Sequence, residues 1–402
     1  PRRERVGVRE PSGRERGPEP VQLNPVLAAM RTYPFLRLDD AKAQVRARGI
    51  ELIDFGVGDP RETTDLRIRE TLAGSLTEVS SYPAARGLPE LHQAIAGWYR
   101  RRYGVCLDAE REVIPTLGSK EAIFLLPFVV GDPHGPKNLV AVPEPAYPVA
   151  ERGALFAHFD ILRLPLREAN GFLPDLRAID AETWRRIALF WVNYPNNPTA
   201  AVAPLSFYEE LSQLAVEYDF LLASDEAYGE IYFGQPPASA VQVGDRRNVA
   251  VVNTLSKRSS MTGYRSGSIV ASPELIDALR AFRPMVGVAP QEFVQRAAVW
   301  AWNDESHVED MRGVYAAKRE VLLQVLERKR LRVAGCDATF YLWVEVPPGE
   351  TSEDFACRLL EGGVVVAPGL YFGESGEGYV RLALVPTLEQ CRRAANILEE
   401  LL

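Results

Sequence analysis

The chain has 402 residues and a formal net charge of −8, and 47% of its residues are hydrophobic while 25% are charged. This composition is that of a globular protein, and the length exceeds what one hydrophobic core usually serves, so we expect two domains. The negative charge argues against binding to nucleic-acid phosphates, and no apolar run reaches the length of a membrane-spanning helix.

The predicted elements change in character along the chain. Residues 1–20 hold six arginines, four glutamates and four prolines, and we predict a disordered tail. Residues 21–60 show no strand–helix alternation, and we expect this N-terminal segment to pack on a small domain. Over residues 61–300, apolar runs such as ALFWVNY and VAVVNTLS alternate with amphipathic patterns such as PLSFYEELSQLAVEYD, which predicts a large α/β domain on a parallel sheet. Residues 301–402 predict a smaller α+β domain.

Polar side chains follow the ends of three consecutive predicted strands. NYPNNP, SDEAY and TLSK supply an amide at Asn197, a carboxylate at Asp225, a phenol at Tyr228 and an amine at Lys257. In an open parallel sheet these ends meet at one edge, where ligands bind. A Gly-Ser turn opens the apolar helix of TLGSKEAIFLL, and the first N–H groups of such a helix suit a phosphate. Arg265 adds paired donors for the same group.

Each of these features has a plainer explanation when it is taken alone. A Gly-Ser turn is usually an N-cap, Asp225 and the asparagine pair could be turn residues, and Lys257 could be a solvated cation. Their conjunction carries the prediction. Lysine is rare here, with six among 46 basic residues, and an amine, unlike a guanidinium, condenses readily with an aldehyde. An aldehyde, a phosphate and a ring nitrogen that pairs with an acid occur together in pyridoxal phosphate.

Longer motifs carry a resemblance to one family. TLSKRSSMTGYRSG, NYPNNPT, SDEAY, EPAYP, SYPAARGLPELHQAI and YVRLAL occur in an order that resembles the class I/II aminotransferases, over about residues 24 to 400. KRSSMTGYRSG, FYLWVEV and VVVAPGLYFG are most similar to bacterial succinyldiaminopimelate aminotransferases. The resemblance implies the type I fold of pyridoxal-phosphate-dependent transferases, an α/β fold in which a large domain with a mostly parallel seven-stranded sheet is joined to a smaller α+β domain.

The resemblance also implies roles for individual residues. Lys257 would bind the cofactor aldehyde and then move the proton, while Asp225 and Tyr228 would contact the ring. Arg381 would hold the substrate α-carboxylate. The residues implied for cofactor binding are Gly118, Ser119, Lys120, Tyr147, Asn197, Asp225, Tyr228, Thr254, Lys257 and Arg265, with Tyr82 reaching across a homodimer; those implied for substrate binding are Gly58, Lys120, Asn197 and Arg381.

Two of these positions have alternatives in the sequence pattern. Arg381 in YVRLALV could instead lie with Tyr379 and Ala383 on the solvent face of a half-buried strand. Lys120 could be a solvated residue in the first turn of a helix, where the helix dipole is slightly unfavourable for it. We expect instead that Lys120 binds the distal carboxylate of a dicarboxylic substrate.

The predicted function is that of an aminotransferase acting on N-succinyl-LL-2,6-diaminopimelate with 2-oxoglutarate. Aspartate, LL-diaminopimelate or another amino acid are alternative substrates, and β-elimination is an alternative reaction on the same cofactor. A transcription regulator is disfavoured because residues 1–20 are too short for a DNA-binding domain. A nicotinamide enzyme is disfavoured because no Gly-x-Gly-x-x-Gly follows a first strand. The four cysteines form no Cys-x-x-Cys pair, so we expect a cytoplasmic enzyme without a metal site.

Overall fold

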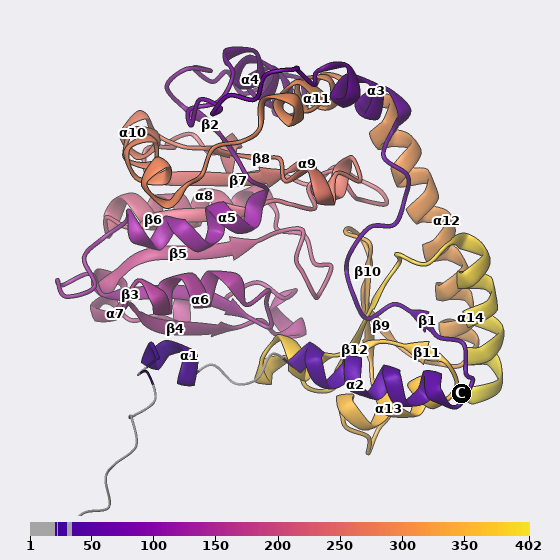
Figure 1. Cartoon of the computed structure of the whole chain (residues 1–402). Helices are drawn as coiled ribbons and strands as arrows, with labels where there is room; N and C mark the ends of the chain where they lie inside the picture. Colours follow the sequence, from indigo (N-terminus) through magenta and orange to yellow (C-terminus); the bar gives the residue numbers. More distant parts are fainter. Residues whose placement is uncertain (1–20, 22, 30–33) are drawn as a thin grey trace, which may run out of the picture.

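The computed structural model describes residue 21, residues 23–29 and residues 34–402, so the tail predicted over residues 1–20 lies outside the described residues. The large domain is built on the strands β2 (Val113–Thr116), β3 (Leu139–Glu144), β4 (Asp160–Pro165), β5 (Ile187–Asn193), β6 (Leu221–Asp225), β7 (Val249–Thr254) and β8 (Gly267–Val270). They form one seven-stranded sheet in the order β2-β8-β7-β6-β5-β3-β4 (Figure 1). β8 is antiparallel to both neighbours and the other pairings are parallel, which confirms the predicted mostly parallel sheet.

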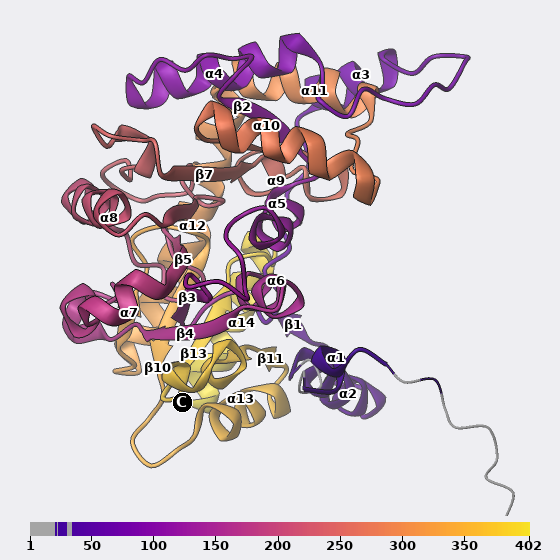
Figure 2. The ribbon, with the colours of Figure 1, turned by 90° about the vertical axis from the view of Figure 1, so that its left-hand side faces the viewer.

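Helices cover both faces of this sheet. They are α3 (Leu66–Gly74), α4 (Pro89–Tyr103), α5 (Ser119–Leu125), α6 (Val149–Phe156), α7 (Ala181–Arg186), α8 (Leu205–Glu217), α9 (Leu255–Arg258), α10 (Pro273–Phe282) and α11 (Glu292–Asn303). Phe190 and Val192 face one apolar cluster with α4, α8 and α11, whereas Leu189 and Trp191 face another with α5, α6 and α10. Figure 2 shows α8 and α5 on opposite sides of the strands. The strands are apolar on both faces because both faces are covered.

The small domain follows in the chain. Its elements are α12 (Ser306–Arg328), β9 (Val333–Gly335), β10 (Tyr341–Glu345), α13 (Ser352–Glu361), β11 (Val364–Val365), β12 (Ala367–Pro368), β13 (Tyr379–Ala383) and α14 (Leu388–Leu401). Four of the strands form an antiparallel sheet in the order β12-β13-β10-β9. Its apolar side packs against α12 and α14, with Tyr315, Leu322 and Leu398 completely or almost completely buried.

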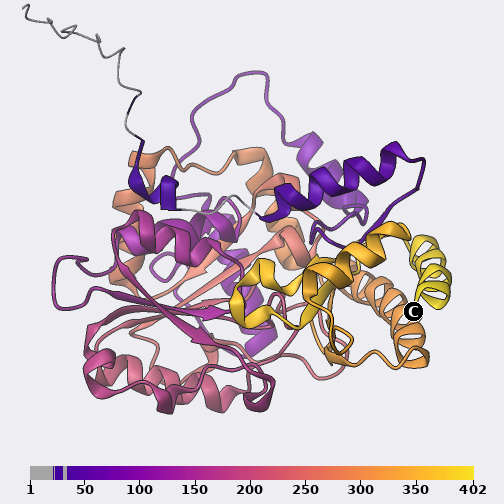
Figure 3. The same ribbon diagram turned by 90° about the horizontal axis from the view of Figure 1, so that it is seen from below.

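The N-terminal segment contributes α1 (Pro25–Ala29), α2 (Pro34–Ala47) and β1 (Ile53–Asp54). β1 pairs in parallel with β11, and α2 lies along α13 (Figures 1 and 3). The chain then crosses to the large domain through residues 55–65. Within the described residues, no helix combines the length and the apolar character needed to cross a membrane.

The polar ends of neighbouring strands lie side by side at one edge of the large sheet. Asn193 of β5 is in register with Asp225 of β6, and Asp225 is in register with Val252 of β7, two residues before Thr254. The small domain reaches this edge, because Arg381 of β13 donates a hydrogen bond to Asn197 in the loop after β5. The site therefore lies where the two domains meet.

Candidate active site

Lys257 presents its amine to the N-terminal segment. It lies in the four-residue helix α9, and its Nζ donates to the carbonyl oxygen of Gly58 at 2.8 Å. Burial lowers the pKa of Lys257 to about 8, with Arg381 among the nearby cations that add to the effect, while the carboxylate of Asp59 opposes it. A lysine with this pKa is a far better nucleophile near neutral pH than a solvated one.

The helix α9, which carries Lys257, is held in place by a cap at its start and by the buried side chain of Arg258. Thr254 caps it, because its side-chain oxygen accepts from the N–H of Ser256 at 3.1 Å. Arg258, the next residue after the lysine, is buried between the rings of Trp98 and Trp302 at 5.2 and 5.0 Å. Its Nη2 donates to Glu305 at 2.9 Å. Arg258 thus anchors the helix in the core, while the side chain of the neighbouring Lys257 points toward Gly58 of the N-terminal segment.

Asp225 ends β6 as a buried carboxyl group. Desolvation raises its pKa to about 7, although the N–H of Ala227 at 3.2 Å and the charge of Lys257 act in the opposite direction. Its own carbonyl oxygen accepts from the side chain of Asn193 at 2.9 Å, and Asn193 also accepts from the N–H of Asn197 at 2.9 Å. Asn193 therefore ties the ends of β5 and β6 together.

Arg381 is a buried cation held by neutral groups. Its Nη1 donates to Oδ1 of Asn197 and its Nη2 to the carbonyl of Gly56, both at 2.8 Å. The guanidinium lies 4.4 Å from the ring centre of Tyr341 and 4.6 Å from that of Phe372, and Nε has no hydrogen-bond partner among the described residues. With 3% of its surface exposed, Arg381 does not lie on a solvent face. A buried cation without a carboxylate at hydrogen-bonding distance is suited to bind an anionic ligand.

Two tyrosines lie between Asp225 and Arg381. The hydroxyl groups of Tyr228 and Tyr341 are 2.8 Å apart. Burial raises the pKa of Tyr228 well above its usual value, so this phenol is protonated and can donate. Gly58 packs against Tyr341, because an added Cβ would approach its hydroxyl group to 2.2 Å.

The predicted phosphate elements also come together. Nη1 and Nη2 of Arg265 donate to the carbonyls of Thr262 and Leu117 at 2.8 and 3.0 Å, and Leu117 directly precedes the turn that opens α5. Gly118 has a φ of 75°, and a Cβ there would come within 2.5 Å of Arg265 Nη2. Glycine at this position therefore lets the guanidinium lie against the turn. The side chain of Thr254 is occupied by Ser256 and Ser266.

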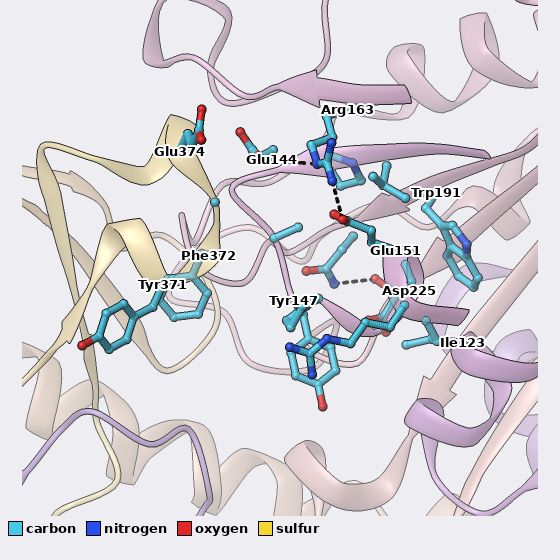
Figure 4. Close-up of a pocket in the computed structure, with 18 of the residues that line it drawn as sticks. Ile123, Glu144, Tyr147, Glu151, Arg163, Trp191, Asp225, Tyr371, Phe372 and Glu374 are labelled. Atoms are coloured by element: carbon cyan, nitrogen blue, oxygen red, sulfur yellow. Dashed lines mark hydrogen bonds and ion pairs between the residues drawn. The ribbon is translucent and has the colours of Figure 1, made fainter. Parts of the chain in front are cut away.

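A cavity of about 790 Å³ runs from this site toward the small domain. Tyr147, Asn193 and Asp225 line its inner part, and Tyr371 and Phe372 of the small domain line the other side (Figure 4). Figure 4 shows the side chains of Tyr147 and Asp225 on the same side of this cavity. Lys257 and Arg381 do not line this cavity.

Two predicted residues lie at the surface of the single chain. Tyr82 is 103% exposed, in the segment between α3 and α4. Lys120 is also exposed, with its Nζ 5.6 Å from the ring centre of Tyr147.

Sequence reasoning missed Tyr341 and Asn193. Tyr341 lies in the FYLWVEV motif as an ordinary strand residue, and Asn193 is the first residue of NYPNNP, in which only Asn197 was assigned a role.

A family model described as aminotransferase class I and II matches residues 50–398. The chain belongs to this family. An LL-diaminopimelate aminotransferase of Aquifex aeolicus (strain VF5) is 41% identical, over 93% of this chain and 98% of that relative. The solved structure of a probable N-succinyldiaminopimelate aminotransferase of Thermus thermophilus has a TM-score of 0.84 and 34% identity, and the match covers 92% of this chain and 100% of that one. A solved aminotransferase of Neisseria meningitidis Z2491 has a TM-score of 0.86 and 36% identity, with 94% and 99% covered.

Aminotransferases of this family depend on pyridoxal phosphate, and this chain is such an enzyme. The side chains described above fit the cofactor. The buried Asp225, with its pKa near 7, suits a cationic ring nitrogen, and the cradle of Gly118 and Arg265 suits a phosphate. When bound, pyridoxal phosphate supplies an aldehyde that takes up the amino group and a ring that accepts electrons. Lys257 would provide the amine that binds this aldehyde.

The first prediction concerns the reactivity of Lys257 in the apoenzyme. Its reaction rate with pyridoxal phosphate should rise about tenfold per pH unit and level off above about pH 8, because only the unprotonated amine attacks. Stopped-flow absorbance over about pH 6 to 10 measures this. Borohydride reduction and peptide mapping should place the adduct on Lys257, and Lys257→Ala should fold without turnover. An adduct on Lys120, or a rate still rising at pH 10, contradicts the assignment.

The second prediction concerns Asp225→Ala. Loss of one charge-assisted hydrogen bond should weaken cofactor binding by about 1.5–3 kcal/mol. The half-reaction with an amino acid should slow by a larger factor, because the interaction strengthens as electron density moves onto the ring in the transition state. Asp225→Asn is the matched control that keeps the shape and removes the charge. Half-reaction rates near wild type in the alanine variant, measured with the cofactor bound, would exclude this role.

Proposed function

We propose that this aminotransferase transfers the amino group of LL-2,6-diaminopimelate, with 2-oxoglutarate and glutamate as the other substrate pair. Three cations lower the pKa of Lys257, namely Arg381, Arg265 and Lys120. The observation that carries the proposal is that Arg381 and Lys120 remain for a substrate when Arg265 is assigned to the phosphate. A substrate with carboxylates at both ends gives each cation a partner. The 41% identity to an LL-diaminopimelate aminotransferase supports the same substrate class.

In this proposal the buried guanidinium of Arg381 binds the α-carboxylate. Asn197 and the Gly56 carbonyl take two of its five N–H donors, so the Nε–H and one N–H on each of Nη1 and Nη2 are left for the ligand. Tyr341 and Phe372 cover the guanidinium and exclude water, which strengthens its attraction for a carboxylate. The amine of Lys257 removes the α-proton and returns it, and the Gly58 carbonyl orients that amine.

The remaining side chains act on the cofactor. Asp225 would keep the ring nitrogen protonated, Tyr228 and Asn197 would donate to the ring oxygen, and Tyr147 would cover the ring face. Gly118, Ser119, Thr254 and Arg265 would hold the phosphate.

A homodimer belongs to the same proposal. Tyr82 is accompanied on its loop by Leu76 and Val79, which are 61% and 75% exposed. Apolar side chains exposed together favour coverage by another surface. A second copy of the chain placed over this loop would bring Tyr82 to the phosphate of the neighbouring site, which the single chain leaves open.

N-succinyl-LL-diaminopimelate is the second candidate substrate. The similarity to the probable N-succinyldiaminopimelate aminotransferase of Thermus thermophilus supports it. The two candidates differ at the distal end, because succinylation replaces an ammonium group by an amide and adds a carboxylate.

The third prediction separates these candidates. Purified enzyme with bound cofactor should show a visible absorbance change on addition of LL-diaminopimelate, with a kcat/KM above those for N-succinyl-LL-diaminopimelate, aspartate and alanine. Single-turnover absorbance with each amino acid alone measures the four values. A higher kcat/KM for the succinylated compound favours the second candidate. Preference for aspartate, or release of pyruvate or ammonia from a β-substituted amino acid, contradicts both.

The fourth prediction concerns Lys120→Ala. Because this ammonium group is exposed in the single chain, the loss should resemble that of an exposed ion pair, about 1 kcal/mol or about fivefold in kcat/KM for dicarboxylates. Alanine, which has no distal carboxylate, should be nearly unaffected. Lys137→Ala is the control, since Lys137 donates to the carbonyl of Tyr218. An equal loss for both kinds of substrate would assign Lys120 to the cofactor or the fold.

A further inference from the structure

The backbone of Leu117, directly before the Gly118-Ser119 turn, is held through both of its polar groups, which lie in two successive peptide groups. Its carbonyl accepts from Nη2 of Arg265 at 3.0 Å, and its N–H donates to Oε2 of Glu121 at 3.1 Å. Arg265 is the cation assigned above to the phosphate. Its position relative to the turn is therefore set through the backbone of Leu117.

Glu121 is held in turn by Arg283. Arg283 opens the short helix η6 (Arg283–Val286) after α10 and is 1% exposed. Its Nε and Nη2 donate to the two carboxylate oxygens of Glu121 at 3.0 and 3.2 Å. A bidentate pair fixes the orientation of a carboxylate. Arg283 thereby keeps the Glu121 carboxylate on the Leu117 N–H.

The pair also neutralises a charge that would oppose the phosphate. The side chain of Glu121 is only 12% exposed, so water solvates it poorly. Without Arg283, its carboxylate would be a partly buried anion separated from Arg265 by the backbone of Leu117, and it would compete for that cation. Neither Glu121 nor Arg283 has a role in the reaction as described so far.

We propose that Arg283 is a positioning residue for the cofactor phosphate, acting through Glu121 and the backbone of Leu117 on Arg265. The inference rests on the proposed placement of the phosphate at Ser119 and Arg265.

The test compares the affinity of the apoenzyme for pyridoxal phosphate with its affinity for pyridoxal, which lacks the phosphate. Arg283→Gln should weaken pyridoxal phosphate by at least about tenfold and pyridoxal by less than about twofold, because the unpaired Glu121 carboxylate acts on the phosphate end. The double variant Glu121→Gln/Arg283→Gln restores neutrality and keeps an oxygen for the Leu117 N–H. It should recover most of the affinity for pyridoxal phosphate.

Arg358→Gln is the matched control. Arg358 forms the same kind of bidentate pair with Glu350, at 3.2 and 2.8 Å, in the small domain. Its loss should leave both affinities unchanged. Thermal unfolding of each apoenzyme shows whether the variants fold. If Arg283→Gln does not, Arg283→Lys keeps the charge with one donor group and should give a smaller loss in the same direction.

A wild-type ratio of the two affinities in a folded Arg283 variant overturns the proposal, as does a double variant no better than the single one. A wild-type apoenzyme that binds pyridoxal as tightly as pyridoxal phosphate has a different meaning. In that case the phosphate placement itself is wrong, and the inference about Arg283 is withdrawn with it.

Discussion

The hydrogen bond from Lys257 to the Gly58 carbonyl joins the two halves of this enzyme. It connects the end of β7 in the large domain to the segment that enters from the small domain, two positions separated by 199 residues. Burial and the neighbouring cations lower the pKa of the amine to about 8. Both effects require the two domains to be in contact around the lysine, since otherwise water would solvate the amine and Arg381 of the small domain would lie farther from it. The chemistry of the lysine is thus a property of the domain arrangement.

The cost of burying cations explains much of the surrounding structure. Arg258, Arg283 and Arg381 are each 1–3% exposed, and each is satisfied in a different way. Arg283 has a bidentate carboxylate, Arg258 has one carboxylate and two indole rings, and Arg381 has two neutral oxygens and two aromatic rings. The first two cations are already paired with protein anions, whereas Arg381 is not, and this difference leaves Arg381 to a substrate.

Much of the site could be predicted because its residues lie at strand ends. Asp225 ends β6 and Lys257 lies three residues after β7, and the parallel pairing of these strands brings their ends to one edge. The burial of Arg381 could not be decided from the sequence, because the alternation of YVRLAL fits a strand with Arg381 on its solvent face equally well. Its burial depends on Gly56 and Tyr341, which come from distant parts of the chain and which strand periodicity does not include.

The sequence by itself determined the α/β class, the mostly parallel sheet and the family, because apolar periodicity and short motifs are local properties of the chain. The tertiary structure decided which polar residues are buried together: the bond between Tyr228 and Tyr341, the link of Asn193 to Asp225, and the pair of Glu121 and Arg283. These contacts join residues 32 to 162 positions apart. The free energy of a buried charge depends on such neighbours, and no local pattern records which of them folding will bring close.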